Sequence, residues 1–325
     1  MSSGEDDLIA RYFRPLAQSP GALGLIDDAA LIESNGEDLV VTTDAIVEGV
    51  HFLPDDPPDS VARKALRVNL SDLVAKGATP AGFVLTLALR EVRENWMAPF
   101  AAALGDDATR FGCPLLGGDT VSTPGPSMIS ITAFGRVPRG TMVRRDRARA
   151  GECVVVSGSI GDAALGLAIL QGRAGRWDGS DAAAEAMVER YRVPQPRLML
   201  APAVRQFASA AMDVSDGLMG DLAKLCAASG VTARIEAEAI PFSPPARTWL
   251  GGDPERIATL VAGGDDYEVL CTVPENQLSA FIAAATLAEV PVSTIGRIGA
   301  GTETVQLLDG NGREIVLPRL SFSHF

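Results

Sequence analysis

The chain has 325 residues, with 41 acidic against 28 basic side chains and a formal net charge of −13. Single hydrophobic cores stop growing near roughly 250–300 residues, so this length predicts two domains. Nucleic acids and anionic membranes bind positively charged surfaces, so neither is expected as a partner. We find no run of about 18 uncharged apolar residues, and the acidic start MSSGEDDLIARYF is unlike a signal peptide. These features predict a cytoplasmic protein.

Cysteine and histidine usage restricts the kinds of metal site. The cysteines are widely spaced, form no C-x-x-C pair and lie in apolar or helical runs, which favours buried thiols over disulfides or zinc: Cys113, Cys153, Cys226 and Cys271. Only His51 and His324 are present, which excludes multi-histidine metal sites. A bound metal would therefore be held by carboxylates, which select magnesium, manganese or calcium.

The first half of the chain alternates predicted strands and helices. We expect strands at 39–44, 83–89 and 127–137 and helices at 59–76 and 96–111. This β-α-β-α-β order is typical of α/β organisation. The irregular basic stretch at 139–152 interrupts the pattern, so the domain boundary is expected there, after residue 146.

The second half again alternates strands and helices. Strands are expected at 153–157, up to Asp213, at 231–235 and at 267–273; helices from about 162, at 182–191, 198–209, 218–228, 255–261 and 277–285. The expected fold class is α/β (α+β), with domains 1–146 and 147–325 that each have helices packed on a mixed sheet.

Three segments place aspartates where an apolar strand ends. They are LVVTTD at Asp44, CPLLGGDT at Asp119, and AAMDVSDG at Asp213 and Asp216. Open α/β sheets bind ligands at the carboxyl ends of their strands, which favours a site for metal or phosphate. Taken singly, each of these segments is better explained by the preference of Asp and Gly for turns, so the prediction depends on the three occurring together.

Other candidate residues have an ordinary alternative role. Asp72 shares a helix face with Asn69 and Lys76, and it could instead be a solvated partner of Lys76. The turn GSIGDAALG could present a helix N-terminus to an anion, although its spacing matches no phosphate-binding motif. Cations that could bind phosphate are Lys64, Arg67, Lys76, Arg144, Arg145, Arg147 and Arg149, the arginines being equally consistent with a solvated linker.

Five motifs in one order resemble the thiamine-monophosphate kinases of the aminoimidazole-ribonucleotide-synthetase superfamily: VTTDAIVEGVHF, NLSDLVAKGATP, LLGGDT, DVSDGL and GGDDYE. The resemblance runs from about Leu8 to the terminal SFSHF. It implies the two-domain synthetase fold and ATP-dependent phosphorylation of thiamine monophosphate to the diphosphate. It also implies several Mg²⁺ ions, ATP as co-substrate, and a homodimer that pairs through the N-terminal domains.

The resemblance also implies a role for particular residues. Metal ligands would be Asp27, Thr42, Thr43, Asp44, Asp72, Asp119, Asp213 and Asp216, with Asp44, Asp72 and Asp119 as the catalytic metal holders. ATP contacts would be Gly118, Asp119, Arg145 and Ser215, and substrate contacts His51, Asp265 and Phe322. The aromatic candidates for the thiamine rings are Trp96, Trp177, Tyr267 and Phe322.

Three departures from the family pattern affect individual roles. Ile26 stands where the family has the glycine of G-D-D-A-A, before Asp27. The segment Arg145-Asp146-Arg147-Ala148 replaces arginine-Ser-Gly-Ala, which leaves Arg144 and Arg147 as rivals of Arg145. Finally, GGDDYE replaces G-G-E-D-Y-E, so Asp265 stands where the family has the longer side chain of glutamate.

The implied chemistry fits the composition. A phosphate monoester has a second pKa near ~6, so the acceptor is already a nucleophilic dianion and in-line attack on the γ-phosphorus needs no general base. Magnesium would reconcile phosphate binding with the −13 charge. The alternatives are another ATP-using synthetase of the superfamily or a non-catalytic nucleotide- and Mg-binding dimer. Selenophosphate synthetase is disfavoured because no cysteine precedes Cys113.

Overall fold

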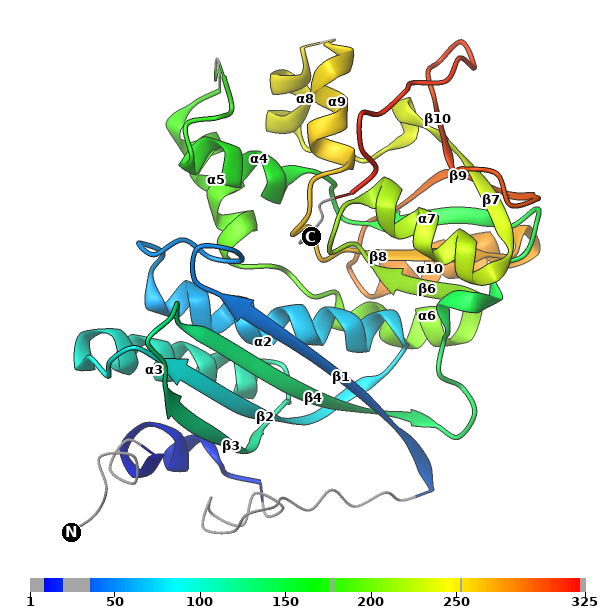
Figure 1. Ribbon diagram of the computed structural model, residues 1–325. Coiled ribbons are helices and arrows are strands. Elements are labelled where there is room, and N and C mark those ends of the chain that lie inside the picture. The colour runs from blue at the N-terminus through cyan, green and yellow to red at the C-terminus, as the bar shows by residue number, and fades with distance from the viewer. Residues whose placement is uncertain (1–8, 20–35, 176, 178, 252, 322–325) are drawn as a thin grey trace. The chain divides into compact units, whose positions relative to one another are not determined.

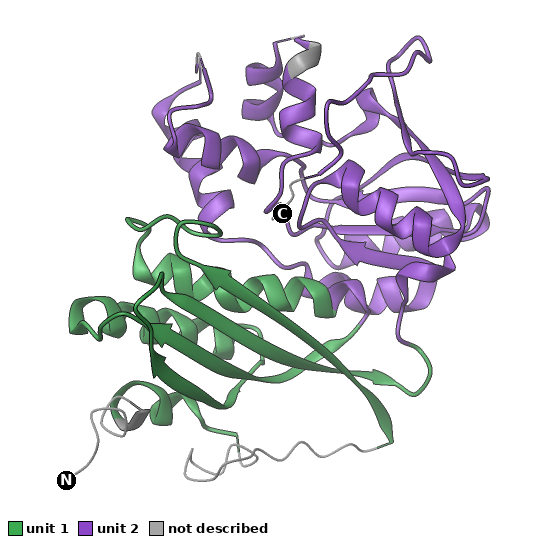
Figure 2. Cartoon of the chain, in the orientation of Figure 1, with its two compact units in different colours: residues 1–73, 78–141 green, residues 74–77, 142–325 purple. Residues whose placement is uncertain are grey.

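The structure is a computed structural model that describes residues 9–19, 36–175, 177, 179–251 and 253–321. The chain divides into two compact units (Figure 2). Unit 1 comprises residues 1–73 and 78–141, and unit 2 comprises residues 74–77 and 142–325. The change at Thr141–Met142 falls in the basic stretch where the sequence places the domain boundary.

Unit 1 is built on a four-stranded sheet in the order β1-β4-β2-β3. Its strands are β1 (Glu37–Val47), β2 (Thr79–Leu89), β3 (Leu115–Ser122) and β4 (Met128–Pro138). Strand β4 is antiparallel to both β1 and β2, and β2 is parallel to β3. Strands β1, β2 and β3 therefore run in one direction, and β1 and β3 form the two edges.

Among the described residues of unit 1, helices cover one face of this sheet and leave the other open. Figure 1 shows α2 (Pro58–Ala75) and α3 (Glu94–Arg110) on the same side. Side chains alternate between the faces of a strand, so Ile129 and Ile131 of β4 are buried against the helices. On the opposite face Leu39 and Val41 of β1 are 42% and 55% exposed.

A buried ion pair joins α2 to α3. The guanidinium of Arg67, 2% exposed, donates to both carboxylate oxygens of Asp107, at 2.5 and 2.9 Å, and Arg63 adds a third contact at 2.7 Å. Lys64 is equally buried and donates to the carbonyl oxygen of His51 at 2.8 Å. The interpretation of Lys64 and Arg67 as phosphate ligands is therefore wrong, because both bind groups of unit 1.

Unit 2 contains a six-stranded sheet in the order β10-β7-β9-β5-β8-β6. The strands are β5 (Cys153–Ser157), β6 (Ala210–Asp213), β7 (Val231–Glu236), β8 (Val269–Val273), β9 (Val292–Ala300) and β10 (Gln306–Leu308). Neighbours are antiparallel except β10 and β7, which are parallel. The C-terminal ends of β5 and β6 and the N-terminal end of β8 therefore lie side by side, at the same end of the strands.

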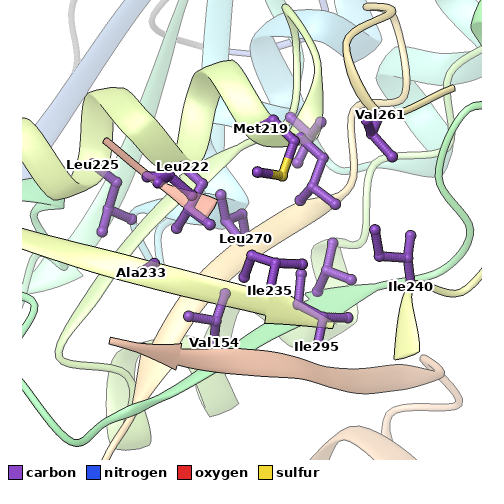
Figure 3. Close-up of a cluster of buried hydrophobic side chains, with 14 of the residues drawn as sticks. Val154, Met219, Leu222, Leu225, Ala233, Ile235, Ile240, Val261, Leu270 and Ile295 are labelled. Carbon is purple, nitrogen blue, oxygen red and sulfur yellow. The ribbon is translucent and has the colours of Figure 1, made fainter. Parts of the chain in front are cut away.

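Hydrophobic clusters cover both faces of this sheet. Val154 and Val156 pack with α7 (Leu218–Ser229), in the cluster drawn in Figure 3, whereas Cys153 and Val155 pack with α6 (Ala201–Phe207) and α10 (Leu278–Leu287). A third cluster joins helices α4 (Asp162–Leu170), α5 (Asp181–Arg192), α8 (Pro244–Leu250) and α9 (Pro254–Val261). A sheet buried on both faces explains why the residues of β5 are apolar without alternation.

The observed elements correct several expectations. Strand β3 continues to Ser122 and β1 to Val47, so Asp119 and Asp44 lie inside strands and only Asp213 ends one. Helix α8 was not expected, and the helix predicted for 198–209 is a short turn followed by α6. All four cysteines are free and buried, as predicted. None of the described helices is long and apolar enough to cross a membrane.

Candidate functional site

Asp44 and Asp72 lie where β1 packs on α2. The hydroxyl of Thr42 donates to the carboxylate of Asp72. Asn69 is fully buried; its side-chain oxygen accepts the backbone N–H of Asp44 at 3.1 Å, and its amide nitrogen donates to the carbonyl of Ala65 at 3.0 Å. Because Asn69 ties the backbone of β1 to α2, it fixes Asp44 relative to Asp72.

Thr43 points to the opposite face of the sheet. Its hydroxyl donates to the carbonyl of Ile131 at 3.2 Å and accepts from the hydroxyl of Thr132 at 3.0 Å. The predicted ligand run Thr42-Thr43-Asp44 is therefore divided, with the side chains of Thr42 and Asp44 on the helix side and that of Thr43 on the open side.

Asp119 also lies on the open face, at the far edge of the sheet. Asp119 pairs with Thr86 of β2. Across the sheet, the residues in register with Thr86 are Ser130 of β4 and then Ala45 of β1, so these four side chains share one face. Asp44 is the next residue of β1 and therefore faces the other way. Three strand spacings separate the two backbones, roughly 14 Å. One copy of unit 1 thus does not bring the carboxylates of Asp44 and Asp119 together.

The two glycines before Asp119 have different surroundings. A side chain at Gly118 would place its Cβ 1.9 Å from the carbonyl oxygen of Leu85, whereas Gly117 has open space. Gly118 is therefore required by the neighbouring strand itself. At Gly117, by contrast, an added Cβ would meet no atom within 4 Å.

His51 is held in the turn that follows β1. Its Nδ1 accepts the backbone N–H of Val47 at 3.1 Å. That bond selects the neutral tautomer with the proton on Nε2, which gives the ring a hydrogen-bond donor at its other end.

A pocket of about 120 Å³ opens beside this turn in unit 1. It is lined by Glu48, Phe52, Pro54, Asp56, Leu89, Arg90, Glu91, Arg93, Trp96 and Ser127. The half-buried indole of Trp96 stacks on Phe100 at 4.8 Å between ring centroids. The backbone N–H of Ser127 lowers the pKa of Glu48 from its ordinary value, so this acid is ionised at neutral pH.

In unit 2 the DVSDG loop is held by a residue that the sequence did not single out. The buried carboxylate of Asp221 accepts the backbone N–H groups of Ser215 and Asp216 at 3.0 and 2.9 Å. Lys224 bridges the carboxylates of Asp221 and Asp216. A sequence signal was present, because Asp221 and Lys224 lie one turn apart on the helix that follows the motif.

For Asp221 and Lys224, burial and hydrogen bonding shift the pKa in opposite directions. Burial raises the pKa of Asp221, and the hydrogen bond from Lys224 offsets only part of that rise. Burial also lowers the pKa of Lys224, but its hydrogen bonds to Asp216 and Asp221 outweigh this, so its pKa is raised overall. The carboxylate of Asp216 thus already binds a cation, the ammonium group of Lys224. Asp213 lies buried at the end of the preceding strand, β6.

The DVSDG and GGDDYE motifs lie against each other. The backbone N–H groups of Asp265 and Tyr267 donate to the carbonyls of Ser215 and Val214, both at 2.8 Å. A Cβ at Gly264 would lie 2.5 Å from the carbonyl oxygen of Ser215, so only glycine fits. The structure therefore brings together Ser215, expected to contact ATP, and Asp265, expected to contact the substrate.

The glycine turn before α4 is already occupied by a carboxylate. The backbone N–H of Gly161 donates to both carboxylate oxygens of Asp266, at 3.0 and 2.9 Å. A Cβ at Gly166 would lie 2.1 Å from the carbonyl of Met187 in α5, so that glycine serves helix packing. The interpretation of this turn as a site for an external anion is therefore wrong.

The arginines at the unit boundary differ in their partners. Arg144 forms an ion pair with Asp146, which raises the pKa of Arg144 through the hydrogen bond. Ser229 donates to the backbone carbonyl of Arg145 at 2.9 Å. Among the described residues, no carboxylate forms an ion pair with the exposed side chain of Arg145. Arg144 is thus already paired with a carboxylate, while Arg145 and Arg147 are both exposed.

The described residues contain no group of three or more His, Cys, Asp or Glu side chains that could hold a metal ion. Asp27 and Phe322 lie outside the described residues. The oxygen donors that are present, carboxylates beside a threonine hydroxyl, are those that Mg²⁺ prefers. The donor chemistry therefore fits magnesium.

Two family models match this chain, one in each half. AIR synthase related protein, N-terminal domain, matches residues 26–137, and the corresponding C-terminal domain matches residues 149–307. The class is thus that of the AIR synthase related proteins, and the two-domain α/β fold class is confirmed.

Full-length relatives narrow this class. The thiamine-monophosphate kinase of Caulobacter vibrioides is 44% identical over 98% of this chain and 90% of its own length. The crystal structure of thiamine-monophosphate kinase from Stenotrophomonas maltophilia K279a is 39% identical with a TM-score of 0.83, covering 94% of this chain and 97% of that one. AaThiL complexed with AMPPCP and TMP is 30% identical with a TM-score of 0.78, covering 92% and 91%. The chain belongs to the thiamine-monophosphate kinase family, a family of phosphotransferases.

Proposed function

We propose that this protein transfers the γ-phosphoryl group of ATP to the phosphate of thiamine monophosphate, giving thiamine diphosphate. The observation that carries the proposal is the full-length match to curated thiamine-monophosphate kinases, with 44% identity to the Caulobacter vibrioides enzyme. The related AaThiL structure contains TMP together with AMPPCP, an ATP analogue, which supports the same pair of substrates here.

The proposed reaction is a direct in-line displacement. An oxygen of the acceptor phosphate, already a dianion near neutral pH, attacks the γ-phosphorus as the bond to ADP breaks. Several Mg²⁺ ions, when bound, would neutralise the repulsion between the phosphates and orient them. In unit 1 we assign Thr42, Thr43, Asp44, Asp72 and Asp119 as ligands, with Asp27 as a further one. Asn69 and Thr42 support this assignment because they hold Asp44 and Asp72 against one another.

Unit 2 is proposed to bind nucleotide and acceptor. Asp213 and Asp216 would add metal ligands, and Ser215 would contact ATP together with Gly118, Asp119 and Arg145. The capping of the DVSDG loop by Asp221 supports this role, because that capping presents a rigid loop to the phosphates. Asp265 and Phe322 would contact the acceptor.

The acceptor's ring system is proposed to enter the pocket beside His51. The Nε2 proton of His51 provides a donor for its phosphate or ring, and Trp96 provides an aromatic wall. The ring face of Trp96 suits a cationic thiazolium, whereas the charge of Glu48 is already shared with Arg90 at 3.6 Å.

The active form is proposed to be a homodimer that pairs through the open faces of unit 1. Leu39 and Val41 expose apolar surface there, which a second copy would bury. Asp44 and Asp119 lie at opposite edges and on opposite faces of one sheet. Face-to-face pairing alone leaves Asp44 pointing away from the interface. We therefore place a shared metal site at the rim of the dimer, where edge strand β1 with Asp44 would meet Asp119 of the partner subunit on its edge strand β3.

The assignment of Asp44 is tested by Asp44→Asn, assayed for thiamine diphosphate formation at saturating Mg²⁺. We expect kcat to fall by about a hundredfold or more, since a lost metal ligand removes stabilisation of the transition state. Asp106→Asn, at a side chain 74% exposed on α3, is the matched control and should retain wild-type turnover. Near-normal kcat in Asp44→Asn would contradict the assignment.

The substrate is tested on the wild-type protein. ADP release should require thiamine monophosphate and should not occur with formylglycinamidine ribonucleotide, the acceptor of the related purine synthetase. ATP binding with no diphosphate product would favour the non-catalytic alternative.

A further inference from the structure

The GGDDYE loop has an unusual backbone conformation. Asp265 and Tyr267 adopt left-handed φ angles of 73° and 50°, which L-residues other than glycine rarely occupy. Such conformations persist only where the surrounding structure enforces them, and they concentrate at functional sites. The residues between and after them, Asp266 and Glu268, are both buried.

Glu268 is the more strongly bound of these two acids. Its carboxylate, with 0% exposure, accepts hydrogen bonds from Ser157 at 2.6 Å, Arg190 at 2.9 Å, and Arg197 at 2.7 and 2.5 Å. Ser157 in turn accepts the backbone N–H of Val269 at 2.8 Å. The end of the loop is thus joined to β5 and to two arginines from the helical part of unit 2.

Asp266 anchors the middle of the loop. It is 1% exposed, and its carboxylate accepts the N–H of Gly161 through both oxygens. Arg190 reaches the backbone carbonyl of Asp266 at 3.4 Å, so one arginine contacts both anchor residues. Burial raises the pKa of Asp266 well above its ordinary value, which shows how thoroughly this group is enclosed.

The glycine turn before α4 is shaped around these anchors. A Cβ at Gly158 would lie 2.0 Å from the Oε1 of Glu268 and 2.5 Å from a terminal nitrogen of Arg197. Gly158 also has a left-handed φ of 59°, as does Gly161 at 83°. Glycine is therefore needed at both positions for the acids to enter, which gives the GSIG segment a definite role.

We propose that Glu268 and Asp266 are positioning residues, which hold Asp265 and Tyr267 in their left-handed conformations so that Asp265 meets the acceptor. Asp266 and Glu268 are buried as anchors, whereas Asp265 and Tyr267 are only half-buried. The inference rests on the proposed function, because only that function gives Asp265 an acceptor to contact. The neighbouring DVSDG loop is hydrogen-bonded to this one but has additional support of its own from Asp221.

The test compares Glu268→Gln with Glu275→Gln in the full-length protein. Glutamine keeps the shape of Glu268 but directs an amide N–H toward an arginine. Glu275 forms an exposed ion pair with Arg297 in the same unit, so it controls for loss of a glutamate charge. In Glu268→Gln we expect the KM for thiamine monophosphate to rise about tenfold or more while the KM for ATP changes less than about threefold. Glu275→Gln should change neither.

A readout independent of activity is hydrogen–deuterium exchange of a peptide spanning 262–269. The amides of Asp265 and Tyr267 donate to the DVSDG loop, so their exchange should accelerate about tenfold in Glu268→Gln and not in Glu275→Gln. Unchanged exchange in folded Glu268→Gln would overturn the inference even if the wild-type protein proves inactive. If wild type is active, equal rises in both KM values would also overturn it.

A second variant covers the case in which Glu268→Gln does not fold. Asp266→Asn retains an oxygen that can accept the N–H of Gly161. It should therefore raise the KM for thiamine monophosphate more than the KM for ATP, but by less than Glu268→Gln does. Wild-type KM values and exchange in that variant would refute a positioning role for Asp266. Thiamine monophosphate turnover in wild type is measured first, so a failure of the proposed function is distinguished from a failure of this inference.

Discussion

Asn69 and Asp221 bind no ligand in the proposed reaction, yet they fix the residues that would. Asn69 joins the backbone at Asp44 to α2, and Asp221 caps the loop that carries Ser215 and Asp216. Both side chains are fully buried, where a polar group is tolerated only with its hydrogen bonds made. The motif pattern revealed the ligand-type residues but not these supports. Asn69 binds a backbone group 25 residues away, whereas Asp221 caps backbone N–H groups only five and six residues before it.

The buried acid Asp266 predicts a dependence of stability on pH. Burial raises its folded pKa above the ordinary value of 3.8, so the folded state binds its proton more tightly than the unfolded chain does. Its contribution to stability is therefore complete below about pH 4 and is lost as the pH rises through the folded pKa.

Asp266→Asn removes this titration. Measured by urea unfolding at several pH values, the free energy of unfolding of the variant relative to wild type should increase between about pH 4 and pH 7. A difference that stays constant over this range would show that the carboxyl does not titrate as the structure indicates.

Among the elements, α2 has roles in both units. Its body packs on β1 in unit 1, and its last turn, from Val74, enters the cluster beneath the sheet of unit 2. Apolar spacing predicted this helix almost to the residue, since periodicity is a local property. The positions of Asp44 and Asp119 within their strands were mispredicted. A turn-forming residue does not end a strand when neighbouring strands continue to pair with it.

The contact between α2 and α3 depends on the buried pair Arg67–Asp107. Asp107→Asn leaves Arg67 without its counter-charge and should lower the free energy of unfolding by about 3–5 kcal/mol. The neighbouring Asp106→Asn removes an exposed charge, and urea denaturation should show a change below about 0.5 kcal/mol. Equal effects of the two substitutions would contradict the structural role of Asp107.

At the level of the assembly, the proposed dimer gives each site one aspartate from each subunit. Asp44→Asn and Asp119→Asn should each be inactive alone. When equal amounts are mixed under conditions of subunit exchange, half of the dimers are mixed, and each mixed dimer regains one site that has both aspartates.

The expected result of mixing is about a quarter of wild-type activity, measured as thiamine diphosphate formed per total protein. No recovery, with exchange verified by light scattering on a size-tagged subunit, would place both aspartates in sites within a single subunit. As an independent check, Val41→Asp on the open face should yield monomers.

The sequence by itself determined which residues offer oxygen donors, the order of most elements, the division into two domains and the family. These follow from local periodicity, composition and motif order. Only the tertiary structure decided that Asp44 and Asp119 face opposite sides of one sheet, because strand order and register are set by pairing between distant segments. It also decided that the GSIG turn receives Asp266 and that Glu268 lies between two arginines. Those contacts join residues 71 to 111 positions apart, and burial makes each of them obligatory.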